Sequence, residues 1–223
     1  MRYTKPHWET SALITIDVHC CTLDDGELEA PGTSAALPRM VELADSFRDA
    51  DRPIVHVVRL YLPDGSNVDA CRRASVEGGA GFLTPGDPGT SLAPELTGGP
   101  VELDAERLLM GEIQSIGPNE VAIYKPRWGA FFQTPLENHL SSLAVDTLVF
   151  CGANFPNCPR TSIYEASERD FRLVAASDGI SGIYERGERE LAAIGATLLP
   201  AAEVSAAIRS HARAGDMSIE ADA

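Results

Sequence analysis

The sequence predicts an α/β fold: a three-layer α/β/α Rossmann-like domain built on a mostly parallel sheet of about six strands. Short β-branched apolar runs alternate along the chain with segments whose apolar residues recur at the helical period. Such alternation indicates βαβ units with right-handed crossovers between parallel strands. Because 223 residues suffice for one complete core, we expect residues 1–223 to form a single domain.

The first predicted strand is Ser11–Val18, which reads SALITIDV. Its nearly continuous apolar character is typical of a strand buried on both faces of a parallel sheet. Helices are predicted at Leu37–Ala50, where apolar residues follow the helical period, and at Leu136–Leu143. The remaining predicted strands are Pro53–Leu60, Val121–Tyr124, Thr147–Cys151, Leu173–Ala176 and a short one at Leu198–Leu199.

Two segments do not fit this alternation. Between residues 61 and 117 no clear strand is predicted, and glycine and proline are dense (EGGAGFLTPGDPGTS). A loop of that length within a compact domain is usually functional or disordered. We therefore expect a lid that covers the substrate, with a surface excursion as the alternative. The tail at residues 212–223 is expected to fray or to dock on another subunit.

The net charge of −15 narrows the possible partners. An acidic surface without a basic stripe repels phosphate groups, so we expect no nucleic-acid and no membrane partner. Long-range steering would favour a cationic substrate, although solubility explains the acidity equally well. No apolar run approaches the roughly 20 residues that span a bilayer, and the N-terminus does not resemble a secretory signal. A cytoplasmic protein is the expectation.

The five cysteines are expected to be reduced. Their number is odd and no CxxC pair occurs, which argues against a disulfide framework and against structural zinc. One of these thiols is therefore a candidate nucleophile.

Three reactive side chains are predicted to meet at one edge of the sheet. Asp17 lies at the end of the first strand, Lys125 directly follows VAIY, and Cys158 lies seven residues after Cys151. In an open α/β sheet, ligands bind outside the carboxyl ends of the strands. Convergence of these groups would place a carboxylate, an ammonium and a thiol at one site.

Each of the three side chains has a functional and an ordinary interpretation. Pro159 favours the first helical position, which makes Cys158 the predicted N-cap, where the helix dipole stabilises a thiolate; the alternative is an inert buried cysteine. Partial desolvation is expected to raise the pKa of Asp17 and make it a better base; otherwise it caps a loop. Lys125 would stabilise developing negative charge, or simply face solvent.

Three segments carry a further signal through their order and spacing: ALITIDVHCC, VAIYKPRWGAFFQTPLENHL and LVFCGANFPNCPRTSIYEASERDFRLVAASDGIS. Together they resemble the isochorismatase-like cysteine hydrolases, the superfamily of nicotinamidases, N-carbamoylsarcosine amidohydrolases, and ureidoacrylate and biuret hydrolases. The resemblance implies that Asp17, Lys125 and Cys158 form a catalytic triad. It also implies a cis peptide at Ala153–Asn154 and an oxyanion held by the main-chain amides of Asn154 and Cys158.

The chain departs from the family pattern at two places. It has Asn154, Phe155 and Pro156 where the family commonly has a threonine-containing run, and His19 where many members carry glutamine. Nicotinamidases bind a metal through an Asp-x-His cluster, whereas this chain reads VVRLYLPDGSNVD after its second predicted strand. We therefore expect no catalytic metal and no cofactor.

Four further residues are candidates for binding substrate. Trp128 and Phe131 follow Lys125 and would wall the substrate, or else pack in the core. Arg160, just after Cys158, would contact an anionic group or lie on the surface. His19 would form hydrogen bonds within the site or only fill space.

The function implied by this resemblance is cleavage of a C–N bond in a small amide, ureide or lactam through a thioester. One alternative is an isochorismatase-type vinyl-ether hydrolase, although some members with that activity lack the cysteine. The other is a non-catalytic carrier or binding module. By the same resemblance, a homodimer or homotetramer is expected.

Overall fold

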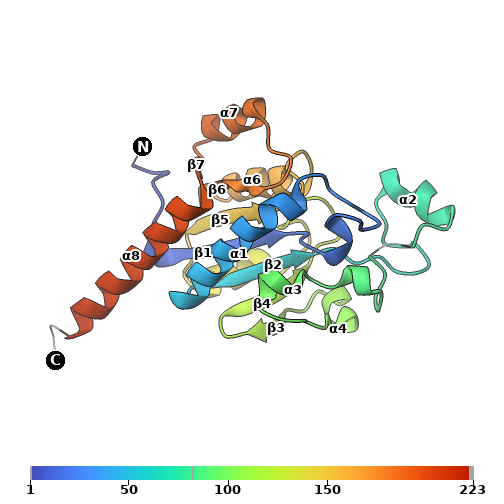
Figure 1. Cartoon of the computed structure of the whole chain (residues 1–223), viewed down its shortest axis with the longest axis horizontal. Coiled ribbons are helices and arrows are strands. Elements are labelled where there is room, and N and C mark those ends of the chain that lie inside the picture. Colours follow the sequence, from blue (N-terminus) through green and yellow to red (C-terminus); the bar gives the residue numbers. More distant parts are fainter. Residues whose placement is uncertain (1, 82, 221–223) are drawn as a thin grey trace.

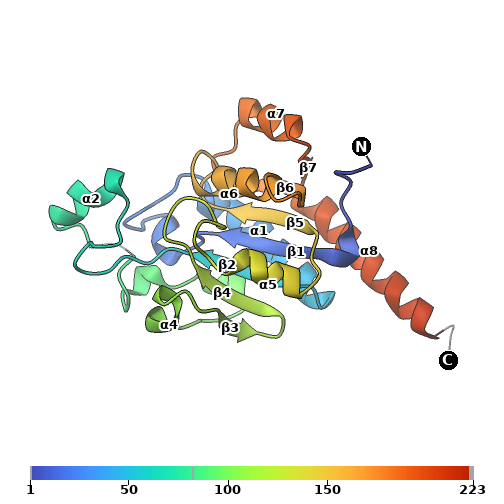
Figure 2. The ribbon, with the colours of Figure 1, turned by 180° about the vertical axis from the view of Figure 1, so that it is seen from behind.

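The computed structural model describes residues 2–81 and 83–220 and confirms the predicted α/β class. A mostly parallel sheet lies between two layers of helices (Figures 1 and 2). Within the described residues the strands are β1 Ser11–Ile16, β2 Ile54–Val58, β3 Gln114–Gly117, β4 Glu120–Tyr124, β5 Thr147–Gly152, β6 Arg172–Ile180 and β7 Thr197–Leu199. The helices are α1 Thr33–Asp49, α2 Ala70–Glu77, α3 Pro94–Thr97, α4 Ala105–Leu109, α5 Leu136–Ser142, α6 Cys158–Ser167, α7 Glu185–Ala193 and α8 Ala201–Glu220. Three short 3-10 turns are η1 Trp8–Thr10, η2 Cys20–Thr22 and η3 Pro88–Thr90.

The sheet order is β3-β4-β2-β1-β5-β6-β7, and only β3 runs antiparallel to its neighbour in the described chain. The sheet thus has seven strands rather than about six. The strand absent from the prediction, β3, reads QSIG and is a partly exposed edge strand. With a single large apolar residue it carries no alternation that a sequence pattern could detect.

Both faces of the sheet are buried, which produces the three layers. Every residue of β1 is buried, and its side chains alternate between two cores. Ile14 packs on the side of α5 and α6, whereas Leu13 packs on the side of α1 and α8. Figure 1 shows α1 and α8 in front of the sheet, and Figure 2 shows α5 and α6 covering the opposite face.

A buried polar network ties α1 to the central strands. His56 of β2 bonds Thr15 Oγ1 through Nδ1 at 2.8 Å and Glu120 Oε1 through Nε2 at 2.7 Å. Arg48 of α1 donates to both carboxylate oxygens of Glu120, at 2.6 and 2.9 Å. The Glu120 side chain is only 6% exposed, so these partners satisfy a carboxylate that would otherwise be costly to bury.

The segment 61–117 is more ordered than predicted. It contains α2, η3, α3, α4 and β3 instead of a structureless loop, and α2 stands away from the sheet in both views (Figures 1 and 2). The tail predicted from residue 212 continues α8 as a helix to Glu220, and residues 221–223 lie outside the described chain. None of the described helices is both long and apolar enough to cross a bilayer.

The strand order reverses at β1. The chain leaves β1 toward β2 on one side, and β5 occupies the other side. Crevices form at such switch points, outside the carboxyl ends of the strands. The topology therefore predicts a binding site among the residues that follow β1, β2, β4 and β5.

Candidate active site

The structure brings together the three reactive side chains predicted to converge. Asp17 is the first residue after β1, Lys125 is the first after β4, and Cys158 begins α6. The Lys125 ammonium is fully buried, and its Nζ lies 2.7 Å from Asp17 Oδ2 and 3.2 Å from Cys158 Sγ. The lysine therefore contacts both the carboxylate and the thiol.

Main-chain constraints hold these residues at the edge of the sheet. The N–H of Asp17 donates to Val57 O at 3.0 Å, and that of Lys125 donates to Val58 O at 2.9 Å, so both remain attached to β2. At the end of β5, Gly152 has φ +121, and a Cβ there would lie 2.2 Å from Ile16 O. Only glycine allows β5 to approach β1 this closely just before the loop that leads to Cys158.

Two expectations about this loop are wrong. Asn157 is the N-cap of α6 and Cys158 is its first helical residue, because Asn157 lies outside the helix at φ −116 and ψ −104. The Ala153–Asn154 peptide is trans, since the described chain contains no cis peptide bond. The trans form of a non-proline bond is favoured by about 3 kcal/mol. The loop is held without the cis bond by Phe155 N–H, which donates to Ser181 O at 2.7 Å.

The electrostatics of Asp17 and Cys158 also differ from expectation. Burial acts to raise the pKa of Asp17, but the positive charges of Lys125 and Arg59 outweigh it, and the pKa is lowered. Burial, reinforced by the Asp17 carboxylate, raises the pKa of the Cys158 thiol to about 12, against the opposing effect of Lys125. The resting site therefore holds a carboxylate beside a neutral thiol, which is the arrangement of a general base and its proton donor.

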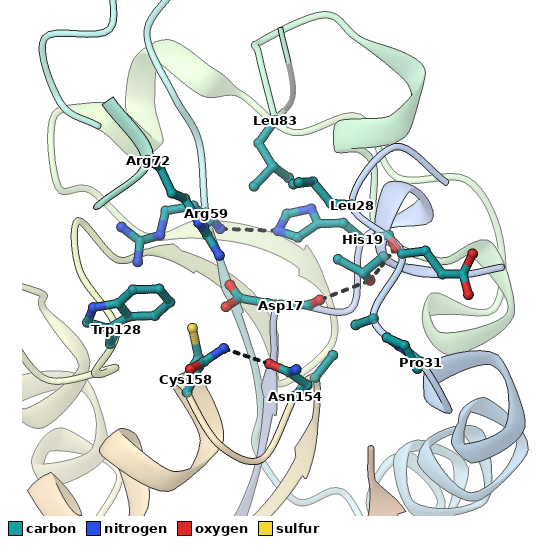
Figure 3. Close-up of a pocket in the computed structure, with 15 residues that line it drawn as sticks. Asp17, His19, Leu28, Pro31, Arg59, Arg72, Leu83, Trp128, Asn154 and Cys158 are labelled. Carbon is teal, nitrogen blue, oxygen red and sulfur yellow. Dashed lines mark hydrogen bonds between the residues drawn. The ribbon is translucent and has the colours of Figure 1, made fainter. Parts of the chain in front are cut away.

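A cavity of about 200 Å³ opens beside these residues. Its lining includes Asp17, Cys158, Trp128 and Asn154, and Figure 3 shows these side chains around one space. The segment 61–117 also contributes to the wall, through Arg72 on α2 and Leu83. The remaining lining residues are His19, Thr22, Leu28, Glu29, Ala30, Pro31, Arg59, Ala153 and Asn157.

Two arginines of the cavity were missing from the sequence prediction. Arg59 is the first residue after β2, a position equivalent to that of Asp17 after β1 and Lys125 after β4. The same rule about carboxyl ends of strands would have identified it. Arg72 offered no such signal, because it lies on a short helix within a segment where no element was predicted.

Of the four predicted substrate-binding residues, two line the cavity and two do not. His19 lines the cavity, but its Nδ1 pairs with Thr90 O at 2.7 Å and its Nε2 accepts the Arg59 N–H at 3.1 Å. Burial lowers the pKa of His19, so it is a neutral ring engaged with the main chain. Trp128 lines the cavity and also packs against the core, so both interpretations of this side chain apply.

Phe131 and Arg160 lie outside the lining of this cavity. Phe131 packs in the core beside α5 and α6, with its ring centroid 5.8 Å from that of Phe171. Arg160 Nη2 pairs with Glu190 Oε2 at 2.6 Å, on the outer side of α6. Helical geometry explains why Arg160 does not reach the cavity, because it lies two residues after Cys158 and residues two apart on a helix do not share a face. In residues 2–81 and 83–220, no group of three or more His, Cys, Asp or Glu side chains is arranged to hold a metal ion.

The chain matches one protein family and resembles several known proteins. Residues 11–207 match the Isochorismatase domain. An Arabidopsis thaliana protein described as a probable inactive nicotinamidase is 26% identical over 166 residues, which are 74% of this chain and 76% of that protein. The crystal structure of an isochorismatase family protein from Desulfovibrio vulgaris superposes with a TM-score of 0.76 at 25% identity, covering 90% of this chain and 98% of that one.

Two further solved structures share the fold at lower identity. A cysteine hydrolase from Pseudomonas syringae gives a TM-score of 0.73 at 20% identity and covers 92% of this chain and 95% of that one. An N-carbamoylsarcosine amidase from Thermoplasma acidophilum gives 0.67 at 20% identity, covering 86% of this chain and 96% of that one.

Proposed function

Since the chain belongs to the isochorismatase family, we propose that it is a cysteine hydrolase that cleaves a C–N bond of a small amide, ureide or lactam through a thioester. The observation that carries this proposal is the buried contact of Lys125 with both Asp17 Oδ2 and Cys158 Sγ. A thiol, a base and a cation within one cavity are the groups that acyl transfer to cysteine requires. That a related N-carbamoylsarcosine amidase shares the fold adds support.

In the first half of the reaction, Asp17 takes the proton of the Cys158 thiol as Sγ attacks the carbonyl carbon. The new C–S bond forms while the carbonyl π electrons move to oxygen. When the C–N bond breaks, the leaving nitrogen takes the proton from Asp17. The lowered pKa of Asp17 keeps it ionised before the attack, and Lys125 stabilises the thiolate as it forms.

In the second half, Asp17 takes a proton from water, and the resulting hydroxide adds to the thioester carbon. Collapse of this intermediate breaks the C–S bond, and the thiol recovers its proton from Asp17. The carboxylate and the neutral thiol are thereby restored, so no proton is gained or lost by the protein over the cycle. The same carboxylate would serve both halves, since Lys125 Nζ, 2.7 Å from Asp17 Oδ2 in the resting site, positions it there.

The oxyanion would lie at the start of α6. Main-chain N–H groups in the first turn of a helix have no acceptor within that helix, and the dipole adds positive potential there. Cys158 opens α6, and Asn154 lies on the same cavity wall. With the Ala153–Asn154 peptide trans, we assign the main-chain N–H of Cys158 the first role and that of Asn154 a supporting one.

A binding module is the main alternative, because one relative is described as a probable inactive nicotinamidase. Catalysis is favoured by Asp17 Oδ1, a buried oxygen that has no hydrogen-bond partner in the described chain. Such atoms are costly and commonly mark functional sites. Vinyl-ether hydrolysis has no evident use for a thiol in contact with Lys125.

The test is release of ammonia or amine from small amides, ureides and lactams by the wild type, Cys158→Ala and the control Cys71→Ala, whose thiol is exposed. We expect activity in the wild type and the control and none in Cys158→Ala. Rapid quenching and mass spectrometry should show an acyl group on the peptide that contains Cys158. Full activity in Cys158→Ala would refute the covalent mechanism.

A further inference from the structure

The Arg59 guanidinium is buried at the cavity, and three of its five N–H groups, those on Nε and Nη2, are unused. The residue is 1% exposed, and its Nη1 contacts Asp69 Oδ2 at 3.2 Å and donates to Pro126 O at 2.5 Å. Nε and Nη2 are buried and have no hydrogen-bond partner among the described residues. Buried donors without acceptors are costly, so their presence indicates an acceptor supplied from outside the chain.

Two of the unused N–H groups, one on Nε and one on Nη2, have a particular geometry. The N–H groups of Nε and Nη2 point in parallel from one edge of the guanidinium plane, and this edge binds a carboxylate through two hydrogen bonds. A neutral carbonyl would satisfy only one of them. Asp69 fixes the other side of the guanidinium and is itself held by the Tyr61 hydroxyl at 2.7 Å. The free edge is therefore oriented before any ligand arrives.

Arg72 adds a second cation on the same side of the cavity. Its Nη1 donates to the Tyr61 hydroxyl at 2.8 Å, and its guanidinium carbon lies 5.0 Å from the centre of a Trp128 ring. Figure 3 shows Arg59 and Arg72 extending into the cavity across from Cys158, with Trp128 beside them. A small molecule whose reacting carbon lies at the thiol would thus present its other end to two guanidinium groups.

The balance of charge around the cavity favours an anion. The cations are Lys125, Arg59 and Arg72, and the carboxylates that pair with them are Asp17 and Asp69. One positive charge, that of the partly buried Arg72, remains without a carboxylate partner among the described residues. A singly charged carboxylate would neutralise it, whereas a cationic substrate would add to it.

We propose that the substrate is an amide, ureide or lactam that carries a carboxylate, which Arg59 binds through Nε and Nη2 while Arg72 supplies a second positive contact. This inference rests on the proposed function, since it names the substrate class of the same site. It reverses the preference for cations suggested by the net charge of −15. Surface charges act weakly beyond about 10 Å at ordinary ionic strength, and Glu29, the other carboxylate on the lining, is exposed to solvent.

The first arm of the test measures binding without turnover. Cys158→Ala protein is titrated calorimetrically with malonamate, succinamate and glutaramate, and with the neutral diamides of the same lengths. We expect at least one acid to bind at least about tenfold more tightly than its diamide, the size of effect that one charge-assisted contact provides. Adding Arg59→Lys, which keeps the charge but removes the parallel donors, should abolish this preference. Arg160→Lys, on the outer side of α6, is the matched control and should retain it.

The second arm compares kcat/KM for each acid with that for its diamide in enzymes with an intact thiol. Arg59→Lys and Arg72→Met should each lower this ratio, mainly through KM, and Arg72→Met gives the answer if Arg59→Lys fails to fold. Hydrolysis of acids and diamides with equal efficiency would overturn the anionic substrate class and leave the hydrolase proposal standing. Preferential binding of an acid without any hydrolysis would support an anionic ligand and overturn the hydrolase proposal. Acids that bind no better than diamides at all three lengths would overturn the inference.

Discussion

Replacing Asp17 with asparagine removes the carboxylate beside Cys158 and leaves the Lys125 ammonium 3.2 Å from Sγ. In the wild type, burial and the Asp17 charge raise the thiol pKa to about 12. The substitution removes the Asp17 contribution to this shift: at an effective dielectric constant of about 20, a like charge at a contact distance of about 4 Å destabilises a thiolate by roughly 4 kcal/mol. Because 1.36 kcal/mol corresponds to one pKa unit, and other groups absorb part of the effect, we expect the pKa of Cys158 to fall by about two to four units in Asp17→Asn.

Alkylation and hydrolysis should therefore change in opposite directions. At pH 8 the larger thiolate fraction is partly offset by the lower nucleophilicity of a weaker base, which leaves an increase of about ten- to a hundredfold in the alkylation rate of Cys158. Amide hydrolysis should fall by about a hundredfold or more, because the general base is lost. The assay is iodoacetamide labelling followed by peptide mass spectrometry, with the exposed Cys71 as the internal reference.

The matched control is Asp49→Asn, which makes the same charge change at an exposed position on α1. It should alter neither rate. An unchanged or slower alkylation of Cys158 in Asp17→Asn would refute the view that the carboxylate keeps the thiol protonated. Undiminished hydrolysis would remove Asp17 from the role of base.

Three further predictions concern stability. Lys125→Met leaves the Asp17 carboxylate buried without its cation, and urea unfolding should show a loss of about 3–5 kcal/mol. Gly152→Ala places a Cβ 2.2 Å from a main-chain oxygen of β1 at φ +121, and should cost about 2 kcal/mol or more, whereas Gly81→Ala, with no atom within 4 Å, should cost little. The pKa of Glu120 is lowered to about 2 because the opposing effect of burial is outweighed by its hydrogen bonds to a histidine and an arginine. The ionised Glu120 carboxylate contributes its full stability above its usual pKa. As the pH falls from about 5 to 2 the free energy of unfolding should therefore drop by about 3 kcal/mol. Glu120→Gln should remove this pH dependence.

Each of these has an outcome that contradicts it. Equal urea midpoints for the wild type and Lys125→Met would show that the ion pair adds no net stability. Equal losses in the two glycine variants would show that backbone flexibility, not the close approach of β5 to β1, sets the cost. An acid transition of Glu120→Gln that coincides with that of the wild type would assign acid sensitivity to other carboxylates.

The convergence of the reactive residues was predictable because parallel strands end at one edge of a sheet. Asp17 and Lys125 are each the first residue after a buried apolar strand, and such runs are readable in sequence. Arg59 occupies the same position after β2 and follows from the same rule. Residues that directly follow parallel strands therefore lie close together in space, which is why the convergence of these side chains could be predicted from the sequence.

The signs of the pKa shifts could not be predicted in the same way. Burial alone predicted a raised pKa for Asp17 and the helix dipole predicted a thiolate at Cys158, yet both signs are reversed. The pKa of Asp17 depends on the charges of Lys125 and Arg59, which follow β4 and β2, and the pKa of Cys158 depends on burial and on the charge of Asp17, which follows β1. For Trp128 and Phe131 the sequence left open whether each walls the substrate or packs in the core, and the structure places Trp128 on the cavity lining and Phe131 in the core.

Chemistry and substrate choice have separate structural origins in this chain. Asp17 and Lys125 remain hydrogen-bonded to β2 through their main chains, so the sheet fixes the reacting groups. Arg72 belongs to α2 in the segment 61–117, which carries no member of the proposed triad. Arg59 joins the two parts, because it follows β2 in the chain while its guanidinium is held by Asp69 from that segment. Movement of the segment would therefore displace the carboxylate-binding edge of Arg59 without disturbing the contact between Lys125 and the thiol, so changes in α2 should alter KM and substrate preference before they alter kcat.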